Sequence, residues 1–591
     1  MKRIRDIFSN ITLPLTAEMP LFLFGMIAAL CNTLRFGIAH ANHLSSWSSM
    51  LLYGCVALLF CWLICLLVYV IKNKIIKGIV KTVAYLFFFI VFAVNIFLWR
   101  NFHTWLSPLY LLLALETNGK ESSEFMRTFS TTSGSIQTYA ACLVAIVAVV
   151  IAEWRHNSIT HKVSMLRNRK TGTVIFIAML IGIGVWIKDY PPLFRCSSAE
   201  DIDNWCSYRQ MIMLDQFTNV TYSIYSLHAT ANDINTAIGK AEQVWKEDIT
   251  CADSDSINII YVLGESYIKK HSALYGYYLN TTPYMLKEQK EGRLFAFDDV
   301  VTPYNATTEA EKNAFSLNSI ADGEQWYHKP MFTTVLKRAG FEVIMYDIQR
   351  DFGTENAVHS TFTMNSLMFN PRICELSYSN VSDKRWDYDM QMIDYYKANV
   401  RPKNSKRLII FHLMGQHLDA AERFPHGQGY DRFKASDIQR NEPWLTDDMR
   451  DAIAQYDNAT YYNDCVIREI INLYRDENTV VVYHADHGEE IFDYRPKQGR
   501  DYSDASADSN LKHYEYDIPL IIWCSDTFQK KHPDIMANIH NSLSRPFMID
   551  NISHTILSLA NVTNHYYIAD RDVISPQFKP RKRIIRGGVE Y

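Results

Sequence analysis

Three polar side chains in the C-terminal half of the chain follow apolar, strand-like runs. Glu265 comes after the run 257–263, and Asp486 and His487 come after the run 479–483. Two carboxylates and an imidazole suit a zinc or manganese ion with an open coordination position. Taken singly, a glutamate after a strand is more often a surface charge or a neighbour of a helix cap, and Asp-His-Gly is a common turn. Together, at one edge of a sheet, the three residues predict a metal site.

A candidate nucleophile lies in the segment that follows the run 257–263. In the segment 302–319, Thr308 and Glu311 have the spacing of a capping box, which predicts that a helix starts here. Thr307 would then stand at or just before a helix N-terminus, where the dipole and the free N–H groups favour a phosphate. A threonine hydroxyl becomes a good nucleophile only when a metal lowers its pKa. The alternatives are that both threonines are simple caps, or that Thr308 is the nucleophile.

Elements that could position these groups are visible from residue 256 onward. Five short apolar runs, separated by longer segments of helical pattern, are found at 257–263, 341–346, 408–413, 479–483 and 518–523. This alternation predicts an α/β domain with a mainly parallel central sheet. Ligands of open α/β sheets bind beyond the carboxyl ends of the strands. The third run passes through His412 and leads to His417, and we therefore expect these two side chains to converge with Glu265, Asp486 and His487 at one edge.

The first 189 residues hold nearly all the long apolar runs. Five of them reach or approach the length of about 20 apolar residues that crosses a bilayer, and they lie at 21–39, 50–71, 79–99, 136–152 and 174–187. A cleaved signal peptide at the first run, or a set of water-soluble core helices, would be the alternative. Four further runs follow the first, and the charges of the loops alternate, so we predict five membrane spans.

The basic residues orient these spans, because lysine and arginine gather on the cytoplasmic side. They precede the first run and recur at 72–81 and 155–170, whereas the loops at 41–47 and 101–135 carry few of them. Five spans that start inside end outside, which predicts an extracytoplasmic C-terminal part, periplasmic in a Gram-negative cell. The predicted domains are a transmembrane domain at 1–189 with a periplasmic loop at 101–135, bridging helices at 190–252 and a catalytic domain at 253–591.

Charge and cysteine usage restrict the function further. A net charge of −4 gives no general attraction to nucleic acid. Six cysteines lie outside the predicted spans, in an oxidising compartment. Among them, Cys196 and Cys206 are close enough in sequence to form a bridge. The chain contains no C-x-x-C motif, so a cysteine zinc site is not supported.

Several motifs occur in a fixed order along the chain. They are Thr117-Asn118-Gly119-Lys120-Glu121, Gly264-Glu265-Ser266, Thr307-Thr308-Glu309, His412 to His417 with Arg423-Phe424-Pro425, Asp486-His487-Gly488-Glu489, and His513 ahead of Ile518-Pro519. With the five spans, this set resembles the phosphoethanolamine transferases of Gram-negative inner membranes, which belong to the alkaline phosphatase/sulfatase superfamily. The resemblance covers nearly the whole chain and implies an alkaline phosphatase-like catalytic domain in the periplasm.

The resemblance also implies roles for individual residues. One catalytic zinc ion would be held by Glu265, Thr307, Asp486 and His487. The transferred phosphoryl group, or a second zinc ion, would be contacted by His417 and His513, with His412 as a further candidate. The lipid donor would be contacted by Thr117, Asn118 and Glu121.

The implied reaction moves phosphoethanolamine from phosphatidylethanolamine to lipopolysaccharide, on the core heptose or on lipid A. Thr307 would carry the group as a covalent intermediate. Gln416, Leu418 and Asp419 depart from the family pattern around His417, which leaves the local backbone there open. The cysteines that flank the nucleophile in lipid A-modifying members are absent, which favours the core heptose.

Three other functions compete with this one. A phosphoglycerol transferase that uses phosphatidylglycerol shares the fold, the metal and the threonine. A non-catalytic, membrane-anchored envelope protein would keep the sheet without needing Thr307. A sulfatase needs Cys-x-Pro-x-Arg or its serine variant, and the segment 305–314 contains neither.

Overall fold

A computed structural model describes residues 10–39, 44–102, 119–156, 169–193, 195–196, 216–251, 255–350, 368–500, 509–562 and 564–591. The chain folds into two compact units. The first unit comprises Met1–Ala114 with Met126–Ala229, and the second comprises Leu115–Phe125 with Thr230–Tyr591. Cys206 lies outside the described residues, so its bridge to Cys196 stays a prediction.

Apolar helices, most of them long, build the first unit. They are α2 (Leu13–Ala17), α3 (Met19–Ala39), α4 (Leu44–Val70), α5 (Lys74–Phe102), α8 (Ser133–Trp154) and α10 (Arg169–Leu193). Four stretches in the described part are long and apolar enough to cross a membrane: Met50–Val70, Lys74–Phe102, Ser133–Trp154 and Lys170–Lys188. The first predicted span falls in α3, whose described side chains form an apolar stretch over Met19–Ala29. The predicted helical membrane part of the fold is confirmed.

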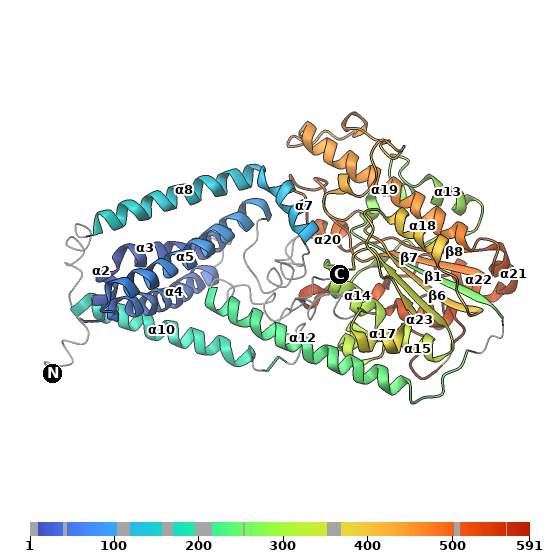
Figure 1. The fold of residues 1–591 in the computed structure, drawn as a ribbon, viewed down its shortest axis with the longest axis horizontal. Helices are drawn as coiled ribbons and strands as arrows, with labels where there is room; N and C mark the ends of the chain where they lie inside the picture. Colours follow the sequence, from blue (N-terminus) through green and yellow to red (C-terminus); the bar gives the residue numbers. More distant parts are fainter. Residues whose placement is uncertain are drawn as a thin grey trace. The chain divides into compact units, whose positions relative to one another are not determined.

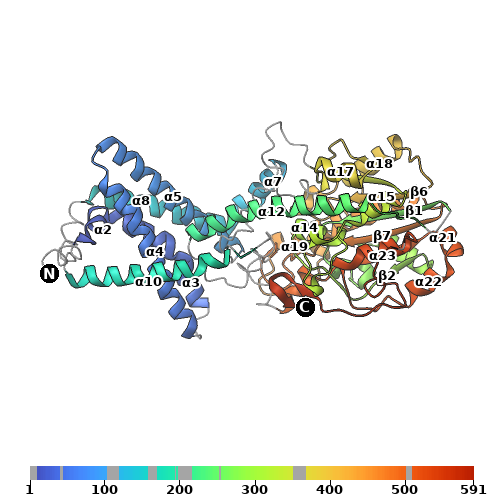
Figure 2. The ribbon, with the colours of Figure 1, turned by 90° about the horizontal axis from the view of Figure 1, so that it is seen from below.

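The helices of this unit pack as a bundle and share a cluster of paired charges around the buried Glu18. α10 lies along α4, and α3 contacts both α4 and α5 (Figure 2). Glu18, at the start of α3, is buried and pairs with Lys77 at 2.6 Å and Lys81 at 3.0 Å. Lys81 also pairs with Glu153 of α8 at 2.9 Å. Buried charges need such partners, and these helix ends are the ones that the basic loops assign to the cytoplasmic side.

The second unit combines one large sheet with helices. Its described helices are the N-terminal part of α7 (Gly119–Ser130), the C-terminal part of α12 (Gln216–Val244), α13 (Pro283–Lys290), α14 (Thr307–Phe315), α15 (Phe332–Arg338), α17 (Pro371–Ser377), α18 (Asp389–Asn399), α19 (Asp447–Leu473), α20 (Ser509–Glu515), α21 (Asp526–Lys531), α22 (Pro533–His540) and α23 (Ile552–Leu559). Of the predicted bridging helices at 190–252, the structure describes α12.

The central sheet has seven strands in the order β2-β8-β7-β1-β6-β4-β5. Their bounds are β1 (Ile257–Gly264), β2 (Leu294–Ala296), β4 (Glu342–Asp347), β5 (Asn380–Val381), β6 (Lys406–His412), β7 (Thr479–Ala485) and β8 (Leu520–Cys524). β7, β1, β6, β4 and β5 are parallel, whereas β8 runs antiparallel to both β7 and β2. The small pairs β3 (Val300–Val301) with β9 (Phe547–Met548) and β10 (Ile584–Ile585) with β11 (Val589–Glu590) lie outside this sheet.

Burial on both faces explains why the five predicted strands form. Every residue of β1, β7 and β8 is buried, which is why their sequences are continuous apolar runs. One helical layer contains α13, α18 and α19, and the other contains α14, α15, α17 and α23, with the sheet between them (Figure 1). The predicted α/β domain with a mainly parallel sheet is confirmed. Its three central strands, β7, β1 and β6, end at the same edge.

Candidate active site

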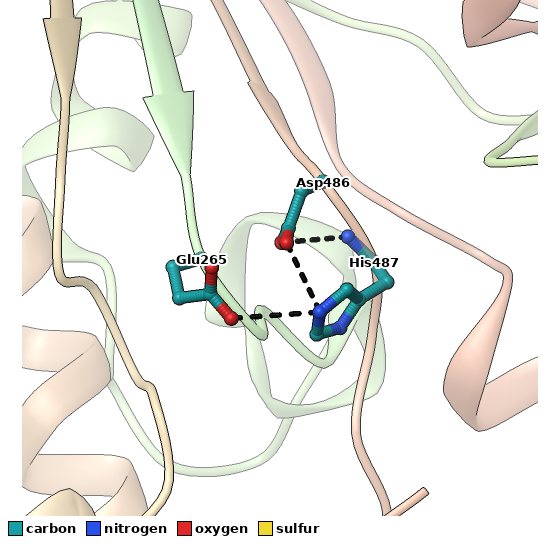
Figure 3. Close-up of side chains that lie close together, drawn as sticks. All are labelled: Glu265, Asp486 and His487. Atoms are coloured by element: carbon teal, nitrogen blue, oxygen red, sulfur yellow. Dashed lines mark hydrogen bonds and ion pairs between the residues drawn. The ribbon is translucent and has the colours of Figure 1, made fainter. Parts of the chain in front are cut away.

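Neighbouring strands bring the three predicted ligands together. β1 and β7 pair in parallel with Gly264 opposite Ala485, so that Glu265 and Asp486 follow side by side. His487 Nε2 lies 3.0 Å from Asp486 Oδ2 and 3.5 Å from Glu265 Oε1 (Figure 3). All three side chains are fully buried. They meet at one edge of the sheet, as their positions after the strands predict.

Two glycines make this close approach possible. A Cβ atom on Gly264 would lie 2.1 Å from the Tyr483 hydroxyl oxygen, and one on Gly488 would lie 1.9 Å from the Tyr514 carbonyl oxygen. Real Cβ atoms do not come within 3.0 Å of another atom, and the Tyr514 oxygen belongs to the backbone. Gly488 in the Asp-His-Gly-Glu motif therefore serves close backbone packing, which fixes the chain just after the imidazole.

Hydrogen bonds orient the Asp486 carboxylate and the His487 imidazole. Asp486 Oδ1 accepts from the backbone N–H groups of Ser266 at 3.0 Å and His487 at 2.7 Å, while its buried Oδ2 accepts no hydrogen bond. His487 Nδ1 donates to the Gly488 carbonyl at 2.7 Å, which places the proton on Nδ1 and leaves the lone pair on Nε2. Such outer contacts fix the tautomer and the ring plane of metal-binding histidines.

The donor set fits a zinc ion. Glu265, Asp486 and His487 each offer one ligand atom, and these atoms lie within 4.8 Å of one another. Among the described residues, no other group of three acidic, histidine or cysteine side chains meets this geometry. Two carboxylate oxygens and one imidazole nitrogen leave a fourth tetrahedral position, as catalytic zinc sites do. The observation that most directly calls for a cation is the buried Oδ2 atom of Asp486, which accepts no hydrogen bond and lies 3.0 Å from the lone-pair side of His487 Nε2.

Thr307 supplies an oxygen beside this set. It is the first residue of α14, and its hydroxyl donates to Glu265 Oε2 at 3.1 Å and lies 3.3 Å from His487 Nε2. The expected capping box is wrong, because the residue before the helix is Ala306, which has no side-chain cap, and Glu311 is buried with no hydrogen bond to either carboxylate oxygen. The helix nevertheless starts where the sequence predicts, and it is the Thr307 hydroxyl that reaches the ligands.

The charges of the site are tightly coupled. Burial would raise the pKa of Asp486, but His487, the Ser266 N–H group and Arg500 hold it well below its usual range. Burial and Arg500 oppose protonation of His487, yet Asp486 and Glu265 outweigh them and raise its pKa. Burial raises the pKa of Glu311 well above its usual value, and nearby carboxylates add to the effect. Several acids therefore crowd a small buried volume, which favours a cation.

Two of the predicted histidines lie near the site in different charge states. Burial lowers the pKa of His417 to about 4, and its Nδ1 atom is buried without a hydrogen bond. Burial would also lower the pKa of His412, but Asp347, 3.1 Å from Nδ1, with Glu311 and Glu265 raises it to about 10. His417 is thus a neutral imidazole at neutral pH. Asp389 holds the turn before it by accepting from the N–H groups at 414 and 415, at 2.7 and 3.1 Å.

Of the remaining predicted residues, His513 has no contact with the ligand set in the described part of the chain. His513, half-exposed on α20, lies 3.3 Å from Asp517 and 2.7 Å from the Tyr591 hydroxyl, and its role stays a prediction. Thr117 and Asn118 lie outside the described residues. Of Glu121 the structure describes the place in α7 (Gly119–Ser130) and not the side chain.

Two site residues were missed by sequence reasoning. Gln349 Nε2 donates to Glu265 Oε2 at 3.1 Å and to the Leu413 carbonyl at 2.9 Å. Gln349 follows the run 341–346, so the rule that ligands lie after strand ends could have found it. The Arg500 guanidinium contacts His487 Nε2 and the Asn305 carbonyl. Arg500 lies in a loop with no periodic pattern, and no signal in the sequence predicted its place at the site.

The chain is similar to several named phosphoethanolamine transferases. Phosphoethanolamine transferase EptC of Escherichia coli (strain K12) is 25% identical over 486 residues, which cover 80% of this chain and 78% of that protein. Phosphoethanolamine transferase CptA of Salmonella typhimurium is 27% identical over 332 residues, 55% of each chain. The integral membrane protein lipooligosaccharide phosphoethanolamine transferase A of Neisseria meningitidis has a TM-score of 0.57 at 17% identity, covering 95% of this chain and 99% of that one. The last likeness extends the shared fold over both units.

The family model described as Sulfatase matches residues 257–562. This segment runs from the start of β1 past the end of α23, and it contains Glu265, Thr307, Asp486 and His487. The chain therefore belongs to the sulfatase family.

Proposed function

We propose that this protein transfers phosphoethanolamine from phosphatidylethanolamine to lipopolysaccharide, with Thr307 carrying the group in between. The observation that carries the proposal is the Thr307 hydroxyl, held 3.1 Å from Glu265 and 3.3 Å from His487 at the first turn of α14. The names of the relatives supply the transferred group. A hydroxyl placed between a carboxylate and an imidazole is the arrangement of an activated nucleophile.

Zinc is the proposed cofactor, held by Glu265, Asp486 and His487 with Thr307 as the fourth ligand. The donor types, the lone pair on His487 Nε2, the Asp486 Oδ2 atom without a hydrogen bond and the crowding of acids support one ion. When bound, zinc would lower the pKa of the threonine hydroxyl and offset negative charge on the phosphoryl oxygens. The family resemblance alone supports a second zinc ion, which His417 and His513 would contact.

The reaction then proceeds in two displacements at phosphorus. In the first, a bond forms between Thr307 Oγ1 and phosphorus, the bond from phosphorus to the diacylglycerol oxygen breaks, and the hydroxyl proton passes to that leaving oxygen. In the second, an oxygen of the acceptor bonds to phosphorus, the bond to Thr307 breaks, and the acceptor proton returns to Thr307. Two steps through a covalent intermediate give ping-pong kinetics.

Side chains around Thr307 support both displacements. Glu265 accepts the hydroxyl hydrogen bond and so orients the attacking oxygen. The α14 N-terminus, with Thr307 as its first residue, directs N–H groups and a positive dipole end toward an incoming phosphate. His417 is neutral and buried, and its Nδ1 atom has no hydrogen bond, which suits it to relay the acceptor proton to Thr307. The transferred phosphoryl group is also proposed to contact His412 and His513. The lipid donor is proposed to contact Thr117, Asn118 and Glu121.

Membrane helices are needed because donor and acceptor are both lipids. The charge pattern places the second unit outside the cytoplasm, which we take to be the periplasmic side of a bacterial inner membrane. An enzyme held in the plane of its substrates meets them by lateral diffusion. Whether the acceptor group is a core heptose or lipid A is decided by locating the label in the product.

The test compares two labelled donors with the full chain, purified in detergent with zinc. Headgroup-labelled phosphatidylethanolamine should pass label to lipopolysaccharide, and fragmentation of the product should locate it on the core heptose or on lipid A. Headgroup-labelled phosphatidylglycerol should pass none. Transfer from phosphatidylglycerol alone would make the protein a phosphoglycerol transferase, and transfer from neither donor would leave a non-catalytic envelope protein.

A further inference from the structure

The chain folds back on itself directly after the Asp-His-Gly-Glu motif. Ile491 and Gln498 form an antiparallel bridge, and the backbone N–H of Phe492 donates to the Lys497 carbonyl at 2.8 Å. The N–H of Gly499 closes this turn on the Glu490 carbonyl at 2.9 Å. The next residue is Arg500, so the loop returns a guanidinium group to the end of β7, where Asp486 and His487 lie.

Arg500 then joins the two segments that carry the reacting groups. One guanidinium nitrogen contacts His487 Nε2 and donates to the Asn305 carbonyl at 3.1 Å. Asn305 precedes Thr307 by two residues. On its other edge, Arg500 Nε lies 3.5 Å from Glu489 Oε2. The Arg500 side chain is 15% exposed, so part of the side chain remains accessible to a ligand.

The site carries an excess of negative charge that a cation such as Arg500 can offset. The ligands Glu265 and Asp486 and the nearby Glu311 and Glu489 are all buried, and a phosphodiester that approaches Thr307 brings a further negative charge. Among the described residues, Arg500 is the arginine or lysine that contacts the ligand set directly. A planar guanidinium binds two phosphate oxygens at once, which a point charge cannot do. Fixed positive charge at a phosphoryl group is also the main source of rate acceleration in phosphoryl transfer.

We propose that Arg500 is a catalytic residue that binds the non-bridging oxygens of the phosphoryl group transferred through Thr307. The assignment rests on the proposed function. His487 Nε2 is the atom that zinc would take, whereas the contacts of Arg500 with Asn305 and Glu489 do not compete with zinc. Those two contacts anchor the guanidinium beside Thr307 Oγ1, which itself lies 3.3 Å from His487 Nε2. The rival reading is a structural clamp that only ties the loop to the segment before α14.

Arg500→Gln and Arg500→Lys separate these readings in the zinc-loaded full chain. The matched control is Arg401→Gln, since Arg401 is an exposed arginine of the same unit that donates to the backbone carbonyls of Lys397 and Val400. Three quantities are measured: bound zinc by elemental analysis, the rate of label transfer from phosphatidylethanolamine to the protein, and the rise in unfolding midpoint caused by free phosphoethanolamine.

For Arg500→Gln we expect the labelling rate to fall about 100-fold or more and the midpoint shift by phosphoethanolamine to disappear, with bound zinc unchanged. Arg500→Lys should recover part of the rate and of the shift, because the charge returns without the fork. Arg401→Gln should match the wild type.

Two results would overturn the assignment. One is wild-type labelling and wild-type phosphoethanolamine binding in Arg500→Gln. The other is loss of zinc and of the folded midpoint in both Arg500 variants, which is the signature of a clamp. Failure of the proposed function is a separate outcome, because then the wild-type protein itself takes no label.

Discussion

The Thr307 hydroxyl donates a 3.1 Å hydrogen bond to Glu265 Oε2, across 42 positions of the sequence. This bond connects the first turn of α14 to the carboxyl end of β1 and sets the nucleophile against the metal ligands. It gives the two threonines of the Thr-Thr-Glu segment different expected roles.

Thr307→Ala is expected to lower turnover by about a thousandfold or more, because the covalent route is lost and other groups of a catalytic unit rescue little. Thr308→Ala is the matched control and should keep most of the activity, since it removes the same atoms one residue away. The measurement is the initial rate of label transfer to lipopolysaccharide for each full-length variant. Equal losses in both variants would show that the change acts on the helix start.

Asp486→Asn should weaken zinc binding by at least about 100-fold, which exceeds the usual cost of losing an outer-shell partner. Its Oδ2 atom, which accepts no hydrogen bond, is the expected metal ligand, and an amide there supplies no charge. Elemental analysis after dialysis at fixed free zinc gives the affinity. Asp526→Asn is the control, since Asp526 is 70% exposed and 4.0 Å from its nearest partner, Arg293. Unchanged zinc content in Asp486→Asn would contradict the ligand assignment.

Zinc should also raise the stability of the wild-type protein. A ligand that binds only the folded state adds about 2.7 kcal/mol at 100 times its dissociation constant. Differential scanning calorimetry with and without a chelator should show a lower unfolding midpoint after chelation, and the difference should shrink in Asp486→Asn. An unfolding midpoint that is the same with and without the chelator would mean that the three buried ligands hold no metal.

Gly488→Ala is expected to destabilise the protein by about 3 kcal/mol or more, because the new Cβ atom would lie 1.9 Å from the Tyr514 carbonyl oxygen. Gly239→Ala is the matched control: it lies within α12, and no atom lies within 4 Å of its added Cβ, so it should stabilise by up to about 1 kcal/mol. Chemical denaturation of both full-length variants gives the comparison. A tolerated Gly488→Ala would show that the two backbone segments can separate.

Stability should fall at alkaline pH through His271, away from the metal ligands. Its Nδ1 lies 2.7 Å from Asp457 and its Nε2 lies 3.1 Å from Asp493. Burial would lower its pKa, but these two aspartates raise it from 6.5 to about 10. A raised folded pKa gives stability that is complete below 6.5 and is lost as the pH rises toward 10. The unfolding midpoint of the wild type should therefore decline over this range.

His271→Gln is the variant that isolates this effect, because glutamine cannot titrate. It should be less stable than the wild type at pH 6, and the difference should narrow by a few kcal/mol toward pH 10. A constant difference across the range would show that His271 is not charged in the folded protein.

The sequence predicted most of what positions the site. All five expected strands are present because each is buried on both faces, which leaves a continuous apolar run. β2 and β5 were missed, since three and two residues at the sheet edges are too short for a pattern. The antiparallel direction of β8 was also not foreseen, because an apolar run carries no direction.

The site was predictable as far as it follows strand ends. Glu265, Asp486 and His487 were found by this rule, and Gln349 obeys it too. The capping box failed because Glu311 faces the buried interior, where tertiary packing outweighs the local spacing rule. Arg500 depends on a turn that closes between Glu490 and Gly499, and such loop geometry leaves no periodic trace in the sequence.

The most direct test of the proposed mechanism is to locate the covalent group. The full-length protein is incubated with zinc and phosphatidylethanolamine, quenched in acid and analysed by peptide mass spectrometry. The mechanism predicts one phosphoethanolamine on Thr307, absent after chelation and absent in Thr307→Ala. Transfer to lipopolysaccharide with the group on another residue, or with no adduct at all, would contradict it.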